Sequence, residues 1–425
     1  MMRLWHLLQR HRRYRRQALW IVPFTAIILE QVAYRVVHAL DDWLGWQLQR
    51  FSAAGAQALL ETIITMTLSF IVFTFGSLLI AIQVAGGQLT PRVIATTLLR
   101  DNVVRYTVGL FVFALLFAIS ALNRIKGTGD QLVLFIAGVL GLLSIAAFLY
   151  LIDYAARLLR PVSILSRIGE SGLTVIEAVY PQPTQGASLP HVTRQIAEMP
   201  SRIVYHTGRS EVILSVNIEM LLKESQKANA VVQLIPVVGD FVGKDEPLFA
   251  LYGNISGIDD SILASSIDFG IERTLEQDPT FAFRIILDIA LKALSPAIND
   301  PTTAVLAIDQ LHRLLRSVGK RNLKADSITD ESGKLRVIFR TPNWEDFVNL
   351  ACTELRRYGA DSIQVVRRLR AMIENLIRTL TEDRHAALQA QLTLLDHAIK
   401  AVYNLPEELA LALATDSQGL GGTPI

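Results

Sequence analysis

The sequence predicts a protein in two parts: an α-helical membrane domain with four transmembrane helices, then a cytosolic α+β region with a small β module and a helical bundle. Two observations lead to this fold class. Four apolar stretches with few charges fill the first third of the 425 residues, and none recurs afterwards. Hydrophobic residues make up 51% of the chain and charged residues only 19%, a bias concentrated before Tyr154. The remaining ~270 residues suit one or two soluble domains.

Each apolar stretch is long enough to cross a hydrocarbon layer ~30 Å thick at about 1.5 Å per helical residue. The second stretch is the clearest, because no charged residue lies between Glu61 and Arg92. The first is the least regular, since Pro23 and Glu30 interrupt it. The predicted spans are Gln17–Tyr34, Thr62–Ala85, Tyr106–Leu122 and Gln131–Ile152.

Arginines predict the orientation of these spans. Six of them precede the first span, and the positive-inside rule places such a segment in the cytoplasm. Four spans return the chain to the same side, where Arg157, Arg160 and Arg167 follow the last span. We therefore expect both termini to be cytoplasmic. The six arginines are Arg3, Arg10, Arg12, Arg13, Arg15 and Arg16.

Composition and hydropathy divide the chain into five segments. A single cysteine, Cys352, excludes an internal disulfide framework and suits a reducing cytosol, and we interpret it as a small buried hydrophobic residue. A Pro-, Gln- and Gly-containing linker is expected around residues 180–190. The predicted segments are a membrane domain (1–160), a linker with the β module (161–260), a helical hairpin (261–320), a C-terminal helical region (321–415) and a disordered tail (416–425).

The β module carries a turn that is typical of one small fold. The Gly239-Asp240-Phe241-Val242 turn and the following Pro247-Leu248 resemble the barrel-sandwich hybrid fold of biotinyl and lipoyl domains and efflux adaptor proteins. Asp245 stands where that pattern usually has a second glycine, and no carrier lysine motif is present. We therefore expect no covalent cofactor, and a module that docks a neighbour or a regulator.

Longer motifs resemble one family. Gln277-Asp278-Pro279, Asp288-Ile289-Ala290, and Ala293-Leu294-Ser295-Pro296 joined to Asn299-Asp300-Pro301 look like runs in the bacterial predicted membrane proteins of domain of unknown function 2254. The turn from Gln88 to Arg92 and the Leu99-Arg100-Asp101 run resemble the first cytoplasmic loop of that family, although Thr90 stands where serine is expected. The resemblance implies an integral protein of the bacterial inner membrane, without an agreed activity or catalytic residues.

The second span carries the main candidate site in the membrane. Five small or polar side chains lie within about 60° of one another on a helical wheel at 100° per residue. They could line a pore between several copies of the chain, or they could pack against a neighbouring helix. Glu30 and Glu61 could form acidic rings at the outer mouth, or they could be solvated helix ends. The pore-lining candidates are Thr62, Thr65, Ser69, Gly76 and Gln83.

Polar motifs in the cytosolic region allow two interpretations. Asp300 can cap a helix that starts at Pro301, or Asn299 and Asp300 can form a polar pocket for a small ligand or for Arg92 of the first loop. Asp309 and His312 share a helix face, but two candidate ligands without a third are weak evidence for a metal. Surface pairing is the favoured interpretation, and we expect no metal site.

Motifs and net charge exclude several classes of function. The sequence lacks a nucleophile elbow, a phosphate-binding glycine loop and a histidine cluster, so we expect no enzyme. A net charge of +2 argues against nucleic-acid binding. The leading hypothesis is a homo-oligomeric inner-membrane channel gated by its cytosolic domain. The alternative is a membrane-anchored sensor or scaffold that binds a partner or small ligand through that domain.

Overall fold

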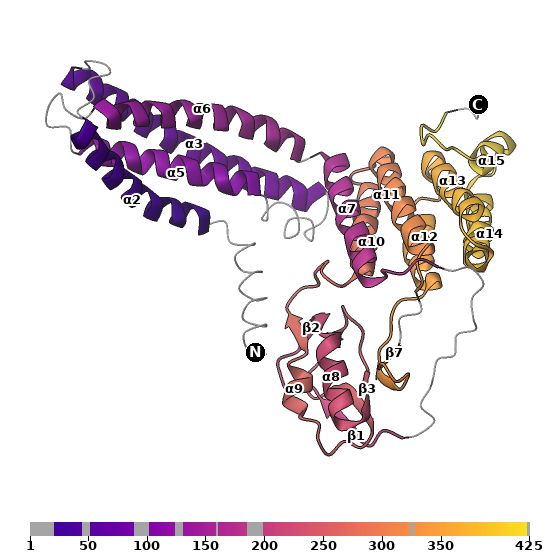
Figure 1. The fold of residues 1–425 in the computed structure, drawn as a ribbon. Helices are drawn as coiled ribbons and strands as arrows, with labels where there is room; N and C mark the ends of the chain where they lie inside the picture. The colour runs from indigo at the N-terminus through magenta and orange to yellow at the C-terminus, as the bar shows by residue number, and fades with distance from the viewer. Residues whose placement is uncertain are drawn as a thin grey trace. The chain divides into compact units, whose positions relative to one another are not determined.

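A computed structural model describes residues 21–44, 52–88, 102–123, 131–158, 160–184, 199–323 and 327–422 (Figure 1). The chain divides into two compact units. The N-terminal unit is Arg3–Ile164 and the C-terminal unit is Leu165–Ile425. Each unit is described by itself.

The N-terminal unit is a bundle of long apolar helices. Helix α5 contacts α2, α3 and α6, and therefore lies at the centre of the packing. Aromatic rings fill the interior: Phe70 and Phe148 stack with centroids 4.0 Å apart, and Tyr34 meets Phe117 edge to face at 5.6 Å. The helices are α2 (Ile21–Leu44), α3 (Ala53–Gln88), α5 (Asn102–Leu122) and α6 (Gln131–Leu158).

Three helices in the described ranges are long and apolar enough to cross a membrane, not the four that the sequence predicts. They contain Ala54–Gln83, Asn102–Leu122 and Leu132–Ala155. The predicted first span, Gln17–Tyr34, is not among them, and Glu30 and Arg35 lie within its helix, α2. Its residues 17–20 lie outside the described residues. Helix α2 nevertheless packs along α5 within the same unit.

Several helices of the C-terminal unit begin where short polar side chains cap them. Asp278 and Asp300 each precede a proline at the first helical position, and Asn343 forms a capping box with Asp346. Helix α7, expected as part of a linker segment, packs on α11 through glycine: a β-carbon at Gly172 would lie 3.1 Å from Leu314. The helices are α7 (Pro161–Val179), α10 (Pro279–Ala293), α11 (Pro301–Gly319), α12 (Trp344–Tyr358), α13 (Ile363–Thr379), α14 (His385–Val402) and α15 (Pro406–Leu413).

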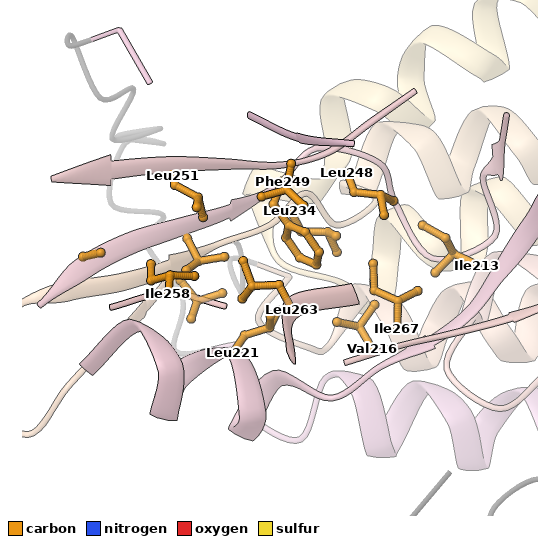
Figure 2. Close-up of a cluster of buried hydrophobic side chains, with 14 of the residues drawn as sticks. Ile213, Val216, Leu221, Leu234, Leu248, Phe249, Leu251, Ile258, Leu263 and Ile267 are labelled. Carbon is orange, nitrogen blue, oxygen red and sulfur yellow. The ribbon is translucent and has the colours of Figure 1, made fainter. Parts of the chain in front are cut away.

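The β module contains two sheets with a common core. One sheet has the strand order β1-β5-β3-β8-β7 and the other has the order β4-β2-β6. Side chains from both sheets and from helices α8 (Ile218–Ala228) and α9 (Asp260–Ala264) form the core, which Figure 2 shows around Phe249 and Leu263. The strands are β1 (Arg202–Tyr205), β2 (Glu211–Val216), β3 (Ala230–Leu234), β4 (Phe241–Val242), β5 (Pro247–Gly253), β6 (Ile267–Gly270), β7 (Ser327–Thr329) and β8 (Leu335–Ile338).

The structure differs from two of the predicted segments. Strands β7 and β8 come after α11 in the chain, yet β8 pairs in parallel with β3 through Val232 and Val337. The β module therefore extends beyond the predicted boundary at residue 260. The described part of the predicted disordered tail is also ordered, because the Asp416 carboxylate accepts hydrogen bonds from Gly419 N at 2.8 Å and Gly421 N at 2.7 Å.

Candidate ligand-binding site

A cavity of about 380 Å³ lies in the C-terminal unit, between the end of α7, the β module and the start of α10. Its size falls within the range of small-molecule sites, about 300–1,000 Å³. Val216 and Leu234 belong both to the core in Figure 2 and to the lining of the cavity. The lining residues are 178–180, 276–279 and 339–342, with Val216, Ile218, Leu234, Val237 and Val238.

The Gln277-Asp278-Pro279 motif builds one wall of this cavity. Asp278 is buried and caps α10: its Oδ1 accepts from Phe281 N at 3.1 Å and from Thr280 Oγ1 at 2.5 Å. Its other oxygen accepts from Arg273 Nε at 2.8 Å, which balances the buried charge. Gln277 Oε1 accepts from Val216 N at 2.9 Å and so ties the motif to β2. The motif therefore joins the helical bundle to the sheet.

Gly239 allows the β-module turn to approach this cap closely. Its φ of +95° lies in the left-handed region that favours glycine. A β-carbon here would lie 2.6 Å from Asp278 Oδ2, and closer still to the Arg273 guanidinium. Asp240 closes the turn, since its Oδ2 accepts from Val237 N at 2.8 Å. The Gly-Asp pair of the predicted turn thus fixes the wall formed by Val237 and Val238.

Tyr180 is the most unusual polar residue of the lining. It directly follows α7, is 1% exposed, and packs edge to face on Phe347 with centroids 6.3 Å apart. Its hydroxyl has no hydrogen-bond partner among the described residues. Burial, followed by the charges of Asp278 and Asp346, raises the pKa of Tyr180 well above its usual value; Thr341 lowers it slightly without reaching hydrogen-bond geometry. The phenol therefore stays neutral and can donate to a ligand.

The remaining polar groups lie in more exposed parts of the lining. Arg340 and Glu276 are exposed, and Thr341 is half-buried. Apolar side chains dominate elsewhere, so the cavity suits a molecule with an apolar body and one hydrogen-bond acceptor near Tyr180. Nowhere in the described ranges do three or more His, Cys, Asp or Glu side chains converge as metal ligands.

The five pore-lining candidates lie together on the exposed face of α3. Thr62, Thr65, Ser69, Gly76 and Gln83 are all exposed, and a β-carbon at Gly76 would meet nothing within 4 Å. Thr67 and Thr74, on the opposite face, are buried. The hydroxyls of Thr62 and Ser69 donate to the backbone carbonyls of Ala58 and Thr65 at 2.7 Å. The stripe therefore does not pack against the other helices that the structure describes.

The two candidate acids at the pore mouth have different surroundings. Glu61 is exposed and its Oε1 accepts from Gln57 Nε2 at 2.8 Å, as a solvated helix end would. Glu30 is 0% exposed and lies within the bundle. Glu30 therefore does not have the surroundings of a solvated helix end, because α2 turns this side chain toward its neighbours, and its place at a pore mouth stays a prediction.

The Asn299–Pro301 motif has the predicted capping geometry. Asp300 Oδ1 accepts from Thr303 N at 3.0 Å, and Pro301 occupies the first position of α11. Asn299 adopts a left-handed conformation with φ of +50°, which turns the chain between α10 and α11. Neither Asn299 nor Asp300 lines the Tyr180 cavity. Arg92, proposed as their partner, lies outside the described residues.

Asp309 and His312 have separate partners. Asp309 pairs with Arg368 at 2.7 Å, and His312 Nε2 lies 3.0 Å from Asn375 Oδ1. Asp309 and His312 therefore each contact a residue of α13 rather than pairing with each other on the surface of α11. Cys352 is buried as predicted, and burial raises the pKa of its thiol to about 12.

Tyr180, Thr341 and Arg340 are site residues that the sequence reasoning missed. Tyr180 was expected in a linker because Pro181 and Pro183 follow it, although an aromatic residue directly after an amphipathic helix was a possible signal. Arg340 and Thr341 lie in the connection between β8 and α12, where no motif distinguishes them. Their proximity to Tyr180 depends on tertiary packing.

The fold defines a helical membrane protein with a C-terminal α+β unit that contains a cavity. The chain belongs to the family described as Predicted membrane protein (DUF2254), whose model matches residues 16–375. It is similar to uncharacterized proteins of Mycobacterium bovis and of two strains of Mycobacterium tuberculosis, each 23% identical over 430 residues, 94% of this chain and 80% of the relative. No solved structure matches the chain. The resemblance inferred from the motifs is confirmed.

Proposed function

We propose that the protein is a membrane-anchored receptor that binds a small, mostly apolar molecule in the Tyr180 cavity. One observation carries the proposal: Tyr180, whose buried hydroxyl has no hydrogen-bond partner among the described residues, belongs to the lining of a mostly apolar cavity of about 380 Å³. An unsatisfied buried polar group costs roughly 1–3 kcal/mol, which a ligand acceptor recovers. The alternative that the sequence ranked second is therefore the one the geometry supports best.

Chain continuity supplies a route from ligand to membrane. Residues 178–180 line the cavity at one end of α7, and only two residues separate Pro161 at its other end from Leu158, the last residue of α6. A ligand that shifts the end of α7 would thus pull on the last candidate membrane span. The proposal includes no catalysis, cofactor or nucleic acid. It places the C-terminal unit in the cytosol of a cell with an inner membrane. Both termini lie there if α2 crosses the membrane as a fourth span beside the three candidate spans.

The receptor test uses the thiol of Cys352, the only cysteine, as a reporter on the full chain in lipid. A bound ligand stabilises the folded unit by RT ln(1 + [L]/Kd), so it slows thiol labelling. We expect some compound of a metabolite library to slow labelling of the wild type, with a weaker effect in Tyr180→Phe and none in Val238→Trp, which fills the cavity.

Ile203→Trp is the matched control, because it adds the same side chain on β1, away from the lining. Organic extracts of purified wild type and Val238→Trp are compared by mass spectrometry in parallel. The receptor proposal fails if both proteins carry the same small molecules and no compound distinguishes their labelling.

A second candidate function, a pore in a homo-oligomer, is favoured by the exposed stripe on α3. Five small or polar side chains occupy a face that is exposed among the described helices, while Thr67 and Thr74 are buried. A ring of such faces from several copies would create a polar axis for a permeating solute. The same stripe could face lipid, since the Thr62 and Ser69 hydroxyls already bond to the backbone.

Thiol accessibility separates these environments. In a Cys352→Ala background, Ser69→Cys should react with a charged, water-soluble thiol reagent if the stripe faces water, because only a hydrated thiol ionises. Thr67→Cys is the buried control and should stay inert. An inert Ser69→Cys, together with no ion flux through reconstituted protein, would remove the pore from consideration.

A further inference from the structure

Three charged side chains belong to the lining of the Tyr180 cavity, and they differ in how their charge is balanced. Asp278 is buried, and its Oδ2 forms an ion pair with Arg273 Nη2 at 2.5 Å. Glu276 is exposed and also interacts with another residue. Arg340 is exposed, and its side chain forms no ion pair or hydrogen bond with a described residue. Arg340 therefore carries the one lining charge that has no partner in the described part of the chain.

Tyr180 and Arg340 lie at different depths of the cavity. Tyr180 is almost fully buried, whereas Arg340 lies in the exposed part of the lining, which we call the rim. Phe339, which precedes Arg340, packs against the core of the β module. Thr341, which follows it, donates from Oγ1 to Leu323 O at 3.3 Å. The backbone is thus fixed on both sides of Arg340, while its guanidinium stays free to bind a group of the ligand.

The guanidinium of Arg340 determines the charge of the group that complements it. A guanidinium has several N–H donors, no acceptor and a permanent positive charge, and its fork matches the two oxygens of a carboxylate. A phosphate monoester fits less well, because one cation does not balance its charge of roughly −1.5 to −2, and Glu276 on the same rim adds repulsion. Apolar side chains form most of the remaining lining. The lining therefore favours a monoanion with an apolar body.

We propose that the ligand of the Tyr180 cavity is an apolar carboxylic acid, bound with its carboxylate at Arg340 and its body inside the cavity. The carboxylate accepts N–H···O bonds from the guanidinium. An ether or carbonyl oxygen of the body accepts the hydrogen bond that the Tyr180 hydroxyl donates. This ligand class rests on the receptor function proposed above, because it describes the molecule that the same cavity binds.

Three probes with the same apolar body and different charges test the ligand class. 6-Methoxy-2-naphthoate is an anion at neutral pH, its amide is neutral, and the corresponding aminomethyl compound is a cation. Each is added to the full chain in lipid, and the rate of Cys352 labelling is measured against probe concentration. We expect the carboxylate to slow labelling at about a fivefold lower concentration than the amide, as one partly exposed ion pair would produce.

Variants of Arg340 show whether this residue causes the difference. In Arg340→Gln the carboxylate and the amide should slow labelling at the same concentration, whereas Arg340→Lys keeps the positive charge and should keep most of the difference. Arg378→Gln is the matched control, because Arg378 is exposed on α13, forms no ion pair with a described residue and lies outside the lining. Labelling without a probe reports folding, and if Arg340→Gln is unfolded, the three probes on the wild type decide.

The outcomes separate the ligand class from the receptor function. Equal protection by the carboxylate and the amide, or an unchanged difference in Arg340→Gln, leaves a receptor for apolar molecules and overturns only the ligand class. Stronger protection by the amine also overturns it and assigns recognition to Glu276. If no probe slows labelling, the library compounds that do so decide: acids support the ligand class, and neutral or cationic compounds overturn it. No active compound at all contradicts the receptor function itself.

Discussion

Asp278→Ala should destabilise the C-terminal unit more than loss of an ordinary helix cap. The change removes the cap of α10, worth about 1 kcal/mol. It also removes the partner of Arg273, whose hydrogen bond to a buried charge is worth about 1 kcal/mol once the partial exposure of the arginine is considered. The sum is about 2 kcal/mol, roughly a 30-fold increase in the population of the open state.

The labelling rate of the native Cys352 thiol reports the population of the open state, so no other probe has to be introduced. It is buried on α12, which packs against α10 through Phe347 and Phe283, with ring centroids 5.2 Å apart. When closing is faster than reaction, the labelling rate of the thiol follows the open population. The full chain in lipid is mixed with a fluorogenic thiol reagent, and the rate is expected to rise roughly 30-fold in Asp278→Ala.

Asp300→Ala is the matched control, because Asp300 caps α11 with the same Asp-Pro sequence but is half-buried and forms no ion pair with a described residue. Loss of about 1 kcal/mol predicts roughly a fivefold faster rate. Asp278→Asn keeps an oxygen for the cap and should fall between the two. Equal rates for Asp278→Ala and Asp300→Ala would refute the contribution assigned to the Arg273 pair.

Two further predictions use the same assay. Gly239→Ala should lower the free energy of unfolding by about 1–3 kcal/mol, because φ is +95° and the new β-carbon meets Asp278 and Arg273. Gly333→Ala is the control: its φ is +78°, but the β-carbon enters open space, so the loss of stability should be smaller. Equal losses would contradict the steric argument. Burial, together with Arg368 and Arg316, lowers the pKa of His312. As pH falls through about 6.5, the unfolded chain therefore binds a proton that the folded chain does not, and stability falls until the folded-state pKa is reached. His312→Gln should flatten this slope, and an unchanged slope would assign it to other groups.

Local features of the fold could be predicted from the sequence because they depend on neighbouring residues. Apolar length identified α3, α5 and α6, and the Asp-Pro pairs at Asp278 and Asp300 mark the starts of α10 and α11. Features that depend on distant partners could not. A short run such as Leu335–Ile338 favours a strand, but nothing in it specifies β3 as its partner.

The candidate site was predictable only in part for the same reason. The Gln277-Asp278-Pro279 motif and the Gly239 turn were visible as patterns, whereas their contact with each other is a property of the folded unit. Glu30 was recognised as a charge within an apolar stretch, but hydropathy does not reveal whether a helix turns such a side chain outward or inward. Tyr180 lacked a motif altogether, and only burial makes it distinctive.

The pairing of β8 with β3 has a consequence for synthesis of the protein. More than a hundred residues separate Val232 from its partner Val337, and helices α10 and α11 lie between them in the chain. On the ribosome, the hairpin of α10 and α11 is therefore complete while one edge of β3 is still open, and an open edge can pair with another nascent chain. Truncation before residue 327 should yield aggregating protein rather than an isolated β domain.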